Sequence, residues 1–183
     1  MKEKKVSLVI TVDCGISSIE EVGLLNGLGI DVIITDHHCP LNGRLPDALA
    51  IINPFRGDCS YPFKLLSGVG VAFKLIEAVY GRFPEEYMDL VCLGTIADVV
   101  PLIGENRILA KCGLSFLNTT SNIGIRSLIE ASGLSNKEIN EMHVGFMLGP
   151  RINSTGRLSN ANTSLELLLT PSNNLILLSS YFI

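Results

Sequence analysis

The first 35 residues constrain the fold most, because two apolar runs of strand length flank one segment with helical periodicity. Segment 17–28 has apolar residues at helical spacing, with Ser17 or Ser18 placed to cap it and Gly29 placed to end it. This order predicts a βαβ unit, whose crossover makes its two strands parallel. We therefore expect an α/β fold with a parallel sheet and flanking helices. The two expected strands are 6–12 (VSLVITV) and 31–35 (DVIIT).

Beyond this unit the pattern passes from strand to helix. A third short strand is expected at 48–53, where Pro54 ends it. We expect a partial α/β lobe over 1–105, a helical part of the same domain over 106–170, and an atypical apolar tail over 171–183. The expected helices are 71–80, 85–99, 106–117, 123–131, 137–147 and 162–169.

Composition excludes several classes of protein. The net charge of −4 argues against a generally basic nucleic-acid binder, although it leaves room for a local basic groove. The longest apolar candidate, 90–103, is interrupted by Asp98 and Pro101, so no membrane span is expected. The five cysteines form no CxxC pair, which suits free thiols in a reducing compartment. We therefore expect a cytoplasmic protein.

Polar side chains follow the first two expected strands where each strand ends. Asp13 comes after the first, and Asp36, His37 and His38 come after the second. The parallel strands of a βαβ unit end at the same edge of a sheet, and if these two are direct neighbours their backbones lie only about 4.7 to 4.9 Å apart. Crowded Asp and His groups there indicate a site for manganese, magnesium or zinc. The plainer alternatives are an ordinary strand exit at Asp13 and a polar surface at the two histidines.

The third candidate site segment is 94–102 (GTIADVVPL), which contains Asp98. Pro101 disfavours helix at the residue before it, so Asp98 is expected in a final helical turn. A carboxylate there meets the negative end of the helix dipole, at a cost of roughly 0.3 to 1 kcal/mol, and a bound cation would remove that cost. Considered alone, a solvated Asp at a helix end is the favoured alternative.

A fourth candidate is segment 149–158 (GPRINSTGRL), expected as a loop that precedes a helix. The segment indicates phosphate binding, because the guanidinium group of an arginine can donate two hydrogen bonds to two oxygens of one phosphate. The candidate binding residues are Arg151, Asn153 and Arg157. Ordinary turn chemistry with solvated arginines is the alternative, and it is favoured when this segment is considered alone. The segment 67–70 (SGVG) lacks the lysine of a P-loop and is expected to let a helix start close to the sheet.

Taken together and in order, DCG, DHH, ADVVPL and GPRINSTGRL resemble the DHH phosphoesterase superfamily, and within it RecJ-type single-stranded-DNA exonucleases. The similarity runs from about residue 6 to residue 170. Ser154 and Thr155 stand where that family more often has two alanines. Small DHH enzymes, such as manganese pyrophosphatases and oligoribonucleases, share the first motifs but not the last one.

The resemblance implies metal-dependent removal of nucleotides from a 5′ end of single-stranded DNA, in repair and recombination. By position, Asp13 would bridge two divalent metals (Mn²⁺ or Mg²⁺), His37 would bind one of them, and Asp98 would complete its shell. Asp36 would orient the site, and His38 would face the substrate phosphate as a hydrogen-bond donor or general acid. A single-stranded-DNA-binding protein is a further candidate partner. The residues that would hold the DNA are Arg151, Asn153 and Arg157.

Two departures from the family pattern bear on activity. None of the twelve residues before Asp13 is Asp or His, whereas RecJ proteins carry a DxDG metal motif there. No glycine-rich second domain or OB-fold is recognisable either. We therefore expect an incomplete two-metal site and a fragment or truncated product that is prone to poor solubility or dimerisation. Two other interpretations stay open: an inactive DHH module that binds DNA or a partner, and a small-substrate phosphodiesterase or pyrophosphatase.

Overall fold

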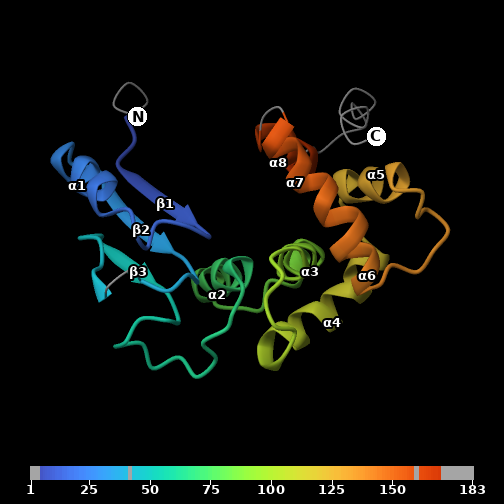
Figure 1. Ribbon diagram of the computed structural model, residues 1–183, viewed down its shortest axis with the longest axis horizontal. Coiled ribbons are helices and arrows are strands. Elements are labelled where there is room, and N and C mark those ends of the chain that lie inside the picture. The colour runs from blue at the N-terminus through green and yellow to red at the C-terminus, as the bar shows by residue number, and fades with distance from the viewer. Residues whose placement is uncertain (1–4, 41–42, 159–160, 170–183) are drawn as a thin grey trace. The chain divides into compact units, whose positions relative to one another are not determined.

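The computed structural model describes residues 5–40, 43–158 and 161–169, which form two compact units (Figure 1). Unit 1 comprises Met1–Pro84 and Ile103–Asn106, and unit 2 comprises Glu85–Leu102 and Arg107–Ile183. The apolar tail expected at 171–183 lies outside the described residues.

Unit 1 contains a parallel sheet of three strands in the order β1-β2-β3, which confirms the predicted α/β fold. Val12 pairs with Thr35, and Thr35 pairs with Ile52, so the three strands end at one level. That level is the carboxyl edge of the sheet. The elements are β1 (Leu8–Val12), α1 (Ile19–Gly27), β2 (Asp31–Thr35) and β3 (Ala50–Ile52).

One face of this sheet packs on α1 and forms a small core. Val22 of α1 contacts Val32 and Ile34 of β2, and all three side chains are buried. On β1, alternate side chains point to the other face, as the two-residue period of a strand requires. These side chains remain about half exposed: Leu8 at 42%, Ile10 at 49% and Val12 at 53%. The described part of the chain therefore leaves the second face of β1 open.

Helix α2 (Gly68–Tyr80) begins at the carboxyl edge of the sheet. The hydroxyl of Ser67 caps it by accepting a hydrogen bond from the N–H of Gly70 at 3.1 Å. Ser67 is itself fixed, because its N–H donates to Oδ1 of Asn106 at 3.1 Å and Nδ2 of Asn106 donates to the carbonyl of Leu65 at 2.6 Å. The expectation that segment 67–70 lets a helix start near the sheet is confirmed.

Unit 2 is helical, with a core made by buried side chains of several helices, among them Leu117, Ile125 and Leu148. The predicted helix at 123–131 is confirmed in full. No helix in the described ranges has the length and apolar character needed to cross a membrane. The helices are α3 (Met88–Ala97), α4 (Gly104–Asn118), whose first residues belong to unit 1, α5 (Ile123–Ala131), α6 (Glu141–His143), α7 (Gly149–Leu158) and α8 (Ala161–Leu169).

Two predictions in unit 2 were wrong. The segment expected as a loop at 149–158 is helix α7, joined to α6 through a π-helical turn at Val144–Leu148. Leu148 is buried and Ile152, one turn later, packs against the same core, so packing overrides the helix-breaking composition of the segment. The helix expected from 137 begins only at Glu141, where Asn140 caps it.

Candidate metal centre

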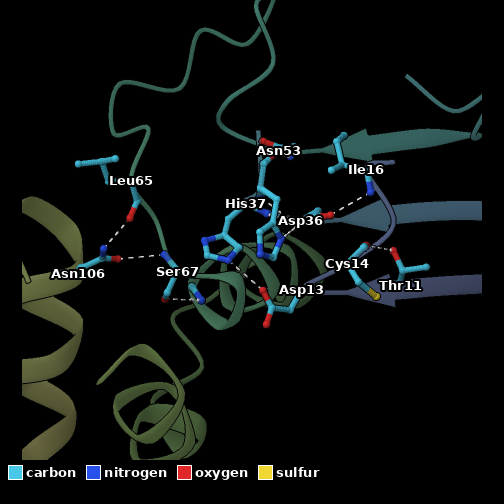
Figure 2. Close-up of polar contacts among 12 residues, drawn as sticks. Thr11, Asp13, Cys14, Ile16, Asp36, His37, Asn53, Leu65, Ser67 and Asn106 are labelled. Carbon is cyan, nitrogen blue, oxygen red and sulfur yellow. Dashed lines mark hydrogen bonds and ion pairs between the residues drawn. The ribbon is translucent and has the colours of Figure 1, made fainter. Parts of the chain in front are cut away.

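Three potential ligands gather where β1 and β2 end (Figure 2). Asp13, His37 and His38 each offer one ligand atom, and these atoms all lie within 4.8 Å of one another. Nε2 of His37 is 3.1 Å from Oδ1 of Asp13. The structure thus brings together three of the residues that the sequence singled out.

The backbone at Asp13 turns sharply at the end of β1. Its N–H donates to the carbonyl of Thr35 at 2.9 Å, so strand pairing continues one residue beyond β1. The φ of Asp13 is 63°, in the left-handed region. Asp and Asn enter this region more readily than other residues with a Cβ, because their short polar side chains bond locally. This conformation brings the carboxylate toward the start of α2.

Gly68 makes room for the Asp13 carboxylate. A Cβ at Gly68 would lie 1.9 Å from Oδ1 and 2.4 Å from Cγ of Asp13. Only hydrogen fits at this position, the first residue of α2. The amino end of a helix carries partial positive charge, which favours a carboxylate placed against it.

Asp36 is a buried anion, with an exposed fraction of 1%. Oδ2 accepts from the N–H of Ile16 at 2.9 Å, and Oδ1 accepts from the N–H of His37 at 2.7 Å and of His38 at 3.1 Å. Burial alone would raise the pKa of Asp36, but these bonds and one from the His38 ring outweigh it, so the pKa is lowered. Asp36 therefore stays ionised at neutral pH.

The Asp36 carboxylate orients the ring of His38. Nδ1 of His38 lies 2.7 Å from Oδ1 of Asp36. An ionised carboxylate accepts but does not donate, so Nδ1 carries the proton and Nε2 is the ring nitrogen with an acceptor lone pair. The His38 side chain is 60% exposed, whereas that of His37 is mostly buried. Nδ2 of Asn53, just after β3, holds the His38 backbone by donating to its carbonyl at 2.9 Å.

The other predicted site residues belong to unit 2. Asp98 follows α3 as its C-cap residue, which agrees with the expected final helical turn. Val99 after it has a φ of 60°, a conformation that costs a β-branched residue about 1 to 3 kcal/mol. Arg151 and exposed Asn153 lie in α7 with Arg157, whose side chain lies outside the described part. The roles of Asp98 and these three residues in one site stay predictions.

Sequence reasoning missed four contributors to the site. Two are backbone features, namely the N–H of Ile16 and the absence of a side chain at Gly68. Neither carries a chemical signal in the sequence. Asn53 and Asn106 act through side-chain amides. Asn53 was the easier to find, because it follows the third strand at the edge where Asp13 and Asp36 follow the first two.

The donor set fits a divalent cation. One carboxylate oxygen and two imidazole nitrogens converge within the reach of one ion, and such mixed sets suit manganese, magnesium and zinc. In metal sites, the ring nitrogen of a histidine ligand that does not face the metal usually donates to a carboxylate or carbonyl, which fixes the ring. The hydrogen bond from Nδ1 of His38 to Asp36 has that form.

Comparison with known proteins gives consistent matches. Residues 1–95 match the model of the DHH family, N-terminal domain. The single-stranded-DNA-specific exonuclease RecJ of Bacillus subtilis is 49% identical over 170 residues, which cover 93% of this chain and 22% of that protein. The Escherichia coli protein of the same name is 44% identical over 178 residues, covering 88% of this chain and 31% of the relative.

Solved structures give the same result. A crystal structure of exonuclease RecJ bound to manganese has a TM-score of 0.82 at 38% identity, covering 96% of this chain and 45% of that one. RecJ from Thermus thermophilus in complex with Mn²⁺ has a TM-score of 0.80 at 37% identity, with coverage of 96% and 26%. The chain thus spans less than half the length of each of these relatives.

Proposed function

Because the chain belongs to the DHH family, we propose that it acts as a metal-dependent exonuclease on single-stranded DNA. The observation that carries this proposal is the convergence of Asp13, His37 and His38 at the carboxyl edge of the sheet. Relatives that match nine-tenths of the chain are named as exonucleases of this specificity, and two of their structures hold manganese.

Asp13 and His37 would hold a divalent cation, Mn²⁺ or Mg²⁺. When bound, this cation would stabilise negative charge on the phosphate. The amino end of α2 and the space at Gly68 keep the Asp13 carboxylate in place. Asp98 as a further ligand, and a second metal bridged by Asp13, are parts of the proposal that rest on the family resemblance.

His38 would act on the substrate phosphate. Asp36 holds its Nδ1, so Nε2 faces away from the buried carboxylate. A protonated ring would donate from Nε2 to a phosphate oxygen or to the leaving oxygen. Asp36 is thus a positioning residue.

The DNA backbone would be held by three residues of α7. Nη1 of Arg151 donates to the carbonyl of Met147 at 3.1 Å, which fixes the guanidinium group. Nε of Arg151 is buried and has no acceptor among the described residues. An acceptor such as a phosphate oxygen would satisfy it. The residues assigned to this role are Arg151, Asn153 and Arg157.

The biological setting follows from the resemblance alone. We propose digestion from the 5′ end, a role in DNA repair and recombination in the cytoplasm, and a single-stranded-DNA-binding protein as a partner.

The direct test is Mn²⁺-dependent release of mononucleotides from a 5′-labelled single strand, with the matching duplex and a dinucleotide as other substrates. Asp13→Asn removes the charge but suits the left-handed backbone, so it isolates the metal ligand. We expect a loss of at least about 100-fold in this variant. Asp31→Asn is the matched control, because Asp31 is exposed at the opposite end of β2.

Three outcomes would contradict the proposal in different ways. Activity retained in Asp13→Asn would refute the metal centre. Cleavage of the dinucleotide alone would point to a small-substrate phosphodiesterase. Mn²⁺ binding that depends on Asp13, without hydrolysis of any substrate, would leave the metal centre standing and refute nuclease activity in this chain.

A further inference from the structure

A pocket of about 370 Å³ opens in unit 1, beside the candidate metal centre. Its lining residues come from the end of β3, the long connection between β3 and α2, and the first turns of α2. The volume lies at the lower end of the range of about 300 to 1,000 Å³ that is usual for small-molecule sites. The lining residues that matter here are Ile52, Asn53, Ser60, Tyr61, Leu66 and Lys74.

The pocket shares structure with the metal centre. Asn53 lines the pocket, and its Nδ2 donates to the backbone carbonyl of His38 at 2.9 Å. Ile52 also lines the pocket, and its carbonyl accepts from the N–H of Asp36 at 3.1 Å. Each of these two lining residues is therefore linked to a residue of the DHH motif by a direct hydrogen bond.

One wall of the pocket is apolar. Ile51 and Ile52 are partly exposed and supply aliphatic surface, and the buried side chains of Pro54, Leu66 and Val71 form the base behind them. Removing such surface from water favours a ligand with a flat apolar face.

The remaining lining residues are mostly polar, and their charges are paired. The hydroxyl of Tyr61 donates to the carboxylate of Glu105 at 2.8 Å. Nζ of Lys74 lies 3.1 Å from Glu77 and 3.5 Å from Glu105. Arg56, the other cation of the lining, is paired with Asp58, so three carboxylates offset two cations, which disfavours a phosphate in this pocket. An uncharged ring with hydrogen-bonding edges suits both parts of the lining.

We propose that this pocket receives one unpaired nucleobase of the DNA strand whose phosphate lies at the candidate metal centre. The inference rests on the proposed function and deepens it. A base in a duplex is paired and stacked, so it cannot enter a pocket without the cost of unpairing and unstacking. A base in a single strand is free to enter. The pocket therefore gives a physical reason for preferring single strands at this site.

The test combines a filled pocket with a missing base. Ser60 is an exposed residue of the lining, so Ser60→Trp fills the pocket without disturbing the core. Ser7→Trp is the matched control, because Ser7 is exposed just before β1, outside the pocket lining. Binding of a labelled phosphorothioate single strand is measured by fluorescence anisotropy. Strands with one abasic nucleotide, placed at each position in turn, are measured beside it.

We expect one abasic position to weaken binding to the natural chain and to Ser7→Trp by about tenfold, the order of a single base contact. Ser60→Trp should bind the complete strand about as weakly, and the same abasic position should then cost nothing more. Ser60→Phe should bind the complete strand with an affinity between those of the natural chain and Ser60→Trp. Thermal melting of each variant checks that the fold is intact.

Two results would refute base binding by the pocket. One is an abasic effect of equal size in Ser60→Trp and in the natural chain. The other is that no abasic position weakens binding to the natural chain. Mn²⁺ titration of the same samples separates this failure from that of the proposed function. Intact Mn²⁺ binding without a base effect refutes the pocket alone, whereas absent Mn²⁺ binding refutes the metal centre on which it rests.

Discussion

At the residue scale, Gly68 is the position where one methyl group would disturb the metal centre most. Gly68→Ala places a Cβ 1.9 Å from Oδ1 of Asp13, so the carboxylate must move. We expect Mn²⁺ affinity, measured by isothermal titration calorimetry, to fall at least about tenfold, as when a contact that orients a ligand is lost.

Gly23→Ala in α1 is the matched control for this change. A Cβ there meets nothing within 4 Å, and the variant should gain about 0.4 to 1 kcal/mol of stability with unchanged affinity for Mn²⁺. Equal affinity in both variants would show that the carboxylate of Asp13 does not need the space at Gly68.

Asp36 gives a prediction about pH. Its pKa is lowered from 3.8, so its contribution to the free energy of unfolding is complete above about pH 4. That contribution is lost as the pH falls through the lower folded value. Asp36→Asn points an amide at N–H donors and should cost about 2 to 3 kcal/mol at neutral pH.

Urea unfolding of both chains at neutral pH and between about pH 2 and 5 checks this prediction. The two curves should approach each other as the pH falls, because the natural side chain becomes protonated. A difference that stays constant down to the lowest pH would mean that the charge of Asp36 contributes nothing to stability.

Residue contacts were predictable from sequence only where topology forces them. Asp13, His37 and His38 meet because parallel neighbouring strands end at one edge. The βαβ pattern predicted that the strands are parallel, and the structure shows that they are direct neighbours. Asp36 was expected to orient the site generally. Its ring contact with His38 and its bond from the N–H of Ile16 depend on loop geometry that spacing does not specify.

At the element scale, the cap of α2 is a second support of the site. Ser67→Ala removes the acceptor of the Gly70 N–H and should lower stability by about 1 kcal/mol in thermal or urea unfolding. Ser18→Ala is the matched control, since Ser18 is the N-cap residue of α1 but makes no side-chain cap bond. Equal losses in both variants would rule out the cap as the cause.

The open face of β1 should promote self-association. Ile10→Lys places a charge in the middle of the exposed apolar row, which disfavours burial against another molecule. We expect the natural chain to associate with increasing concentration in sedimentation velocity, and the variant to remain monomeric. Leu24→Lys, on exposed surface of α1, should leave association unchanged. A monomeric natural chain at all concentrations would contradict the prediction.

Elements marked by a local apolar pattern were predicted well, and elements defined by packing were not. Strand β2 and helix α5 have the predicted bounds: β2 is a short continuous apolar run, and α5 has apolar residues at helical spacing. Helix α7 contains Gly149, Pro150 and Gly156, so its composition indicates a loop. Its helical form depends on contacts of Ile152 with residues far away in sequence.

At the scale of the whole molecule, hydrogen exchange can show which elements of the two units are stabilised by bound Mn²⁺. A ligand stabilises the part of a protein that binds it, by about 2.7 kcal/mol at a concentration 100 times its Kd. With Mn²⁺ present, hydrogen exchange should slow in β1, β2 and the start of α2. Slowing in α3 as well is expected if Asp98 is a ligand, and Asp98→Ala should abolish that part alone. Unchanged exchange throughout unit 1 would contradict the metal centre.

The left-handed backbone at Asp13 also limits what mutation can do to this gene. Most residues with a Cβ pay about 1 to 2 kcal/mol for that conformation, whereas Gly, Asn and Asp adopt it readily. A library randomised at this codon and selected for folding alone should therefore return all three. The same library selected for manganese binding should return Asp, because Asn lacks the charge and Gly lacks the side chain. Position 13 thus has two separate requirements, a residue that tolerates the left-handed backbone and a charged side chain that binds the metal, and only Asp meets both.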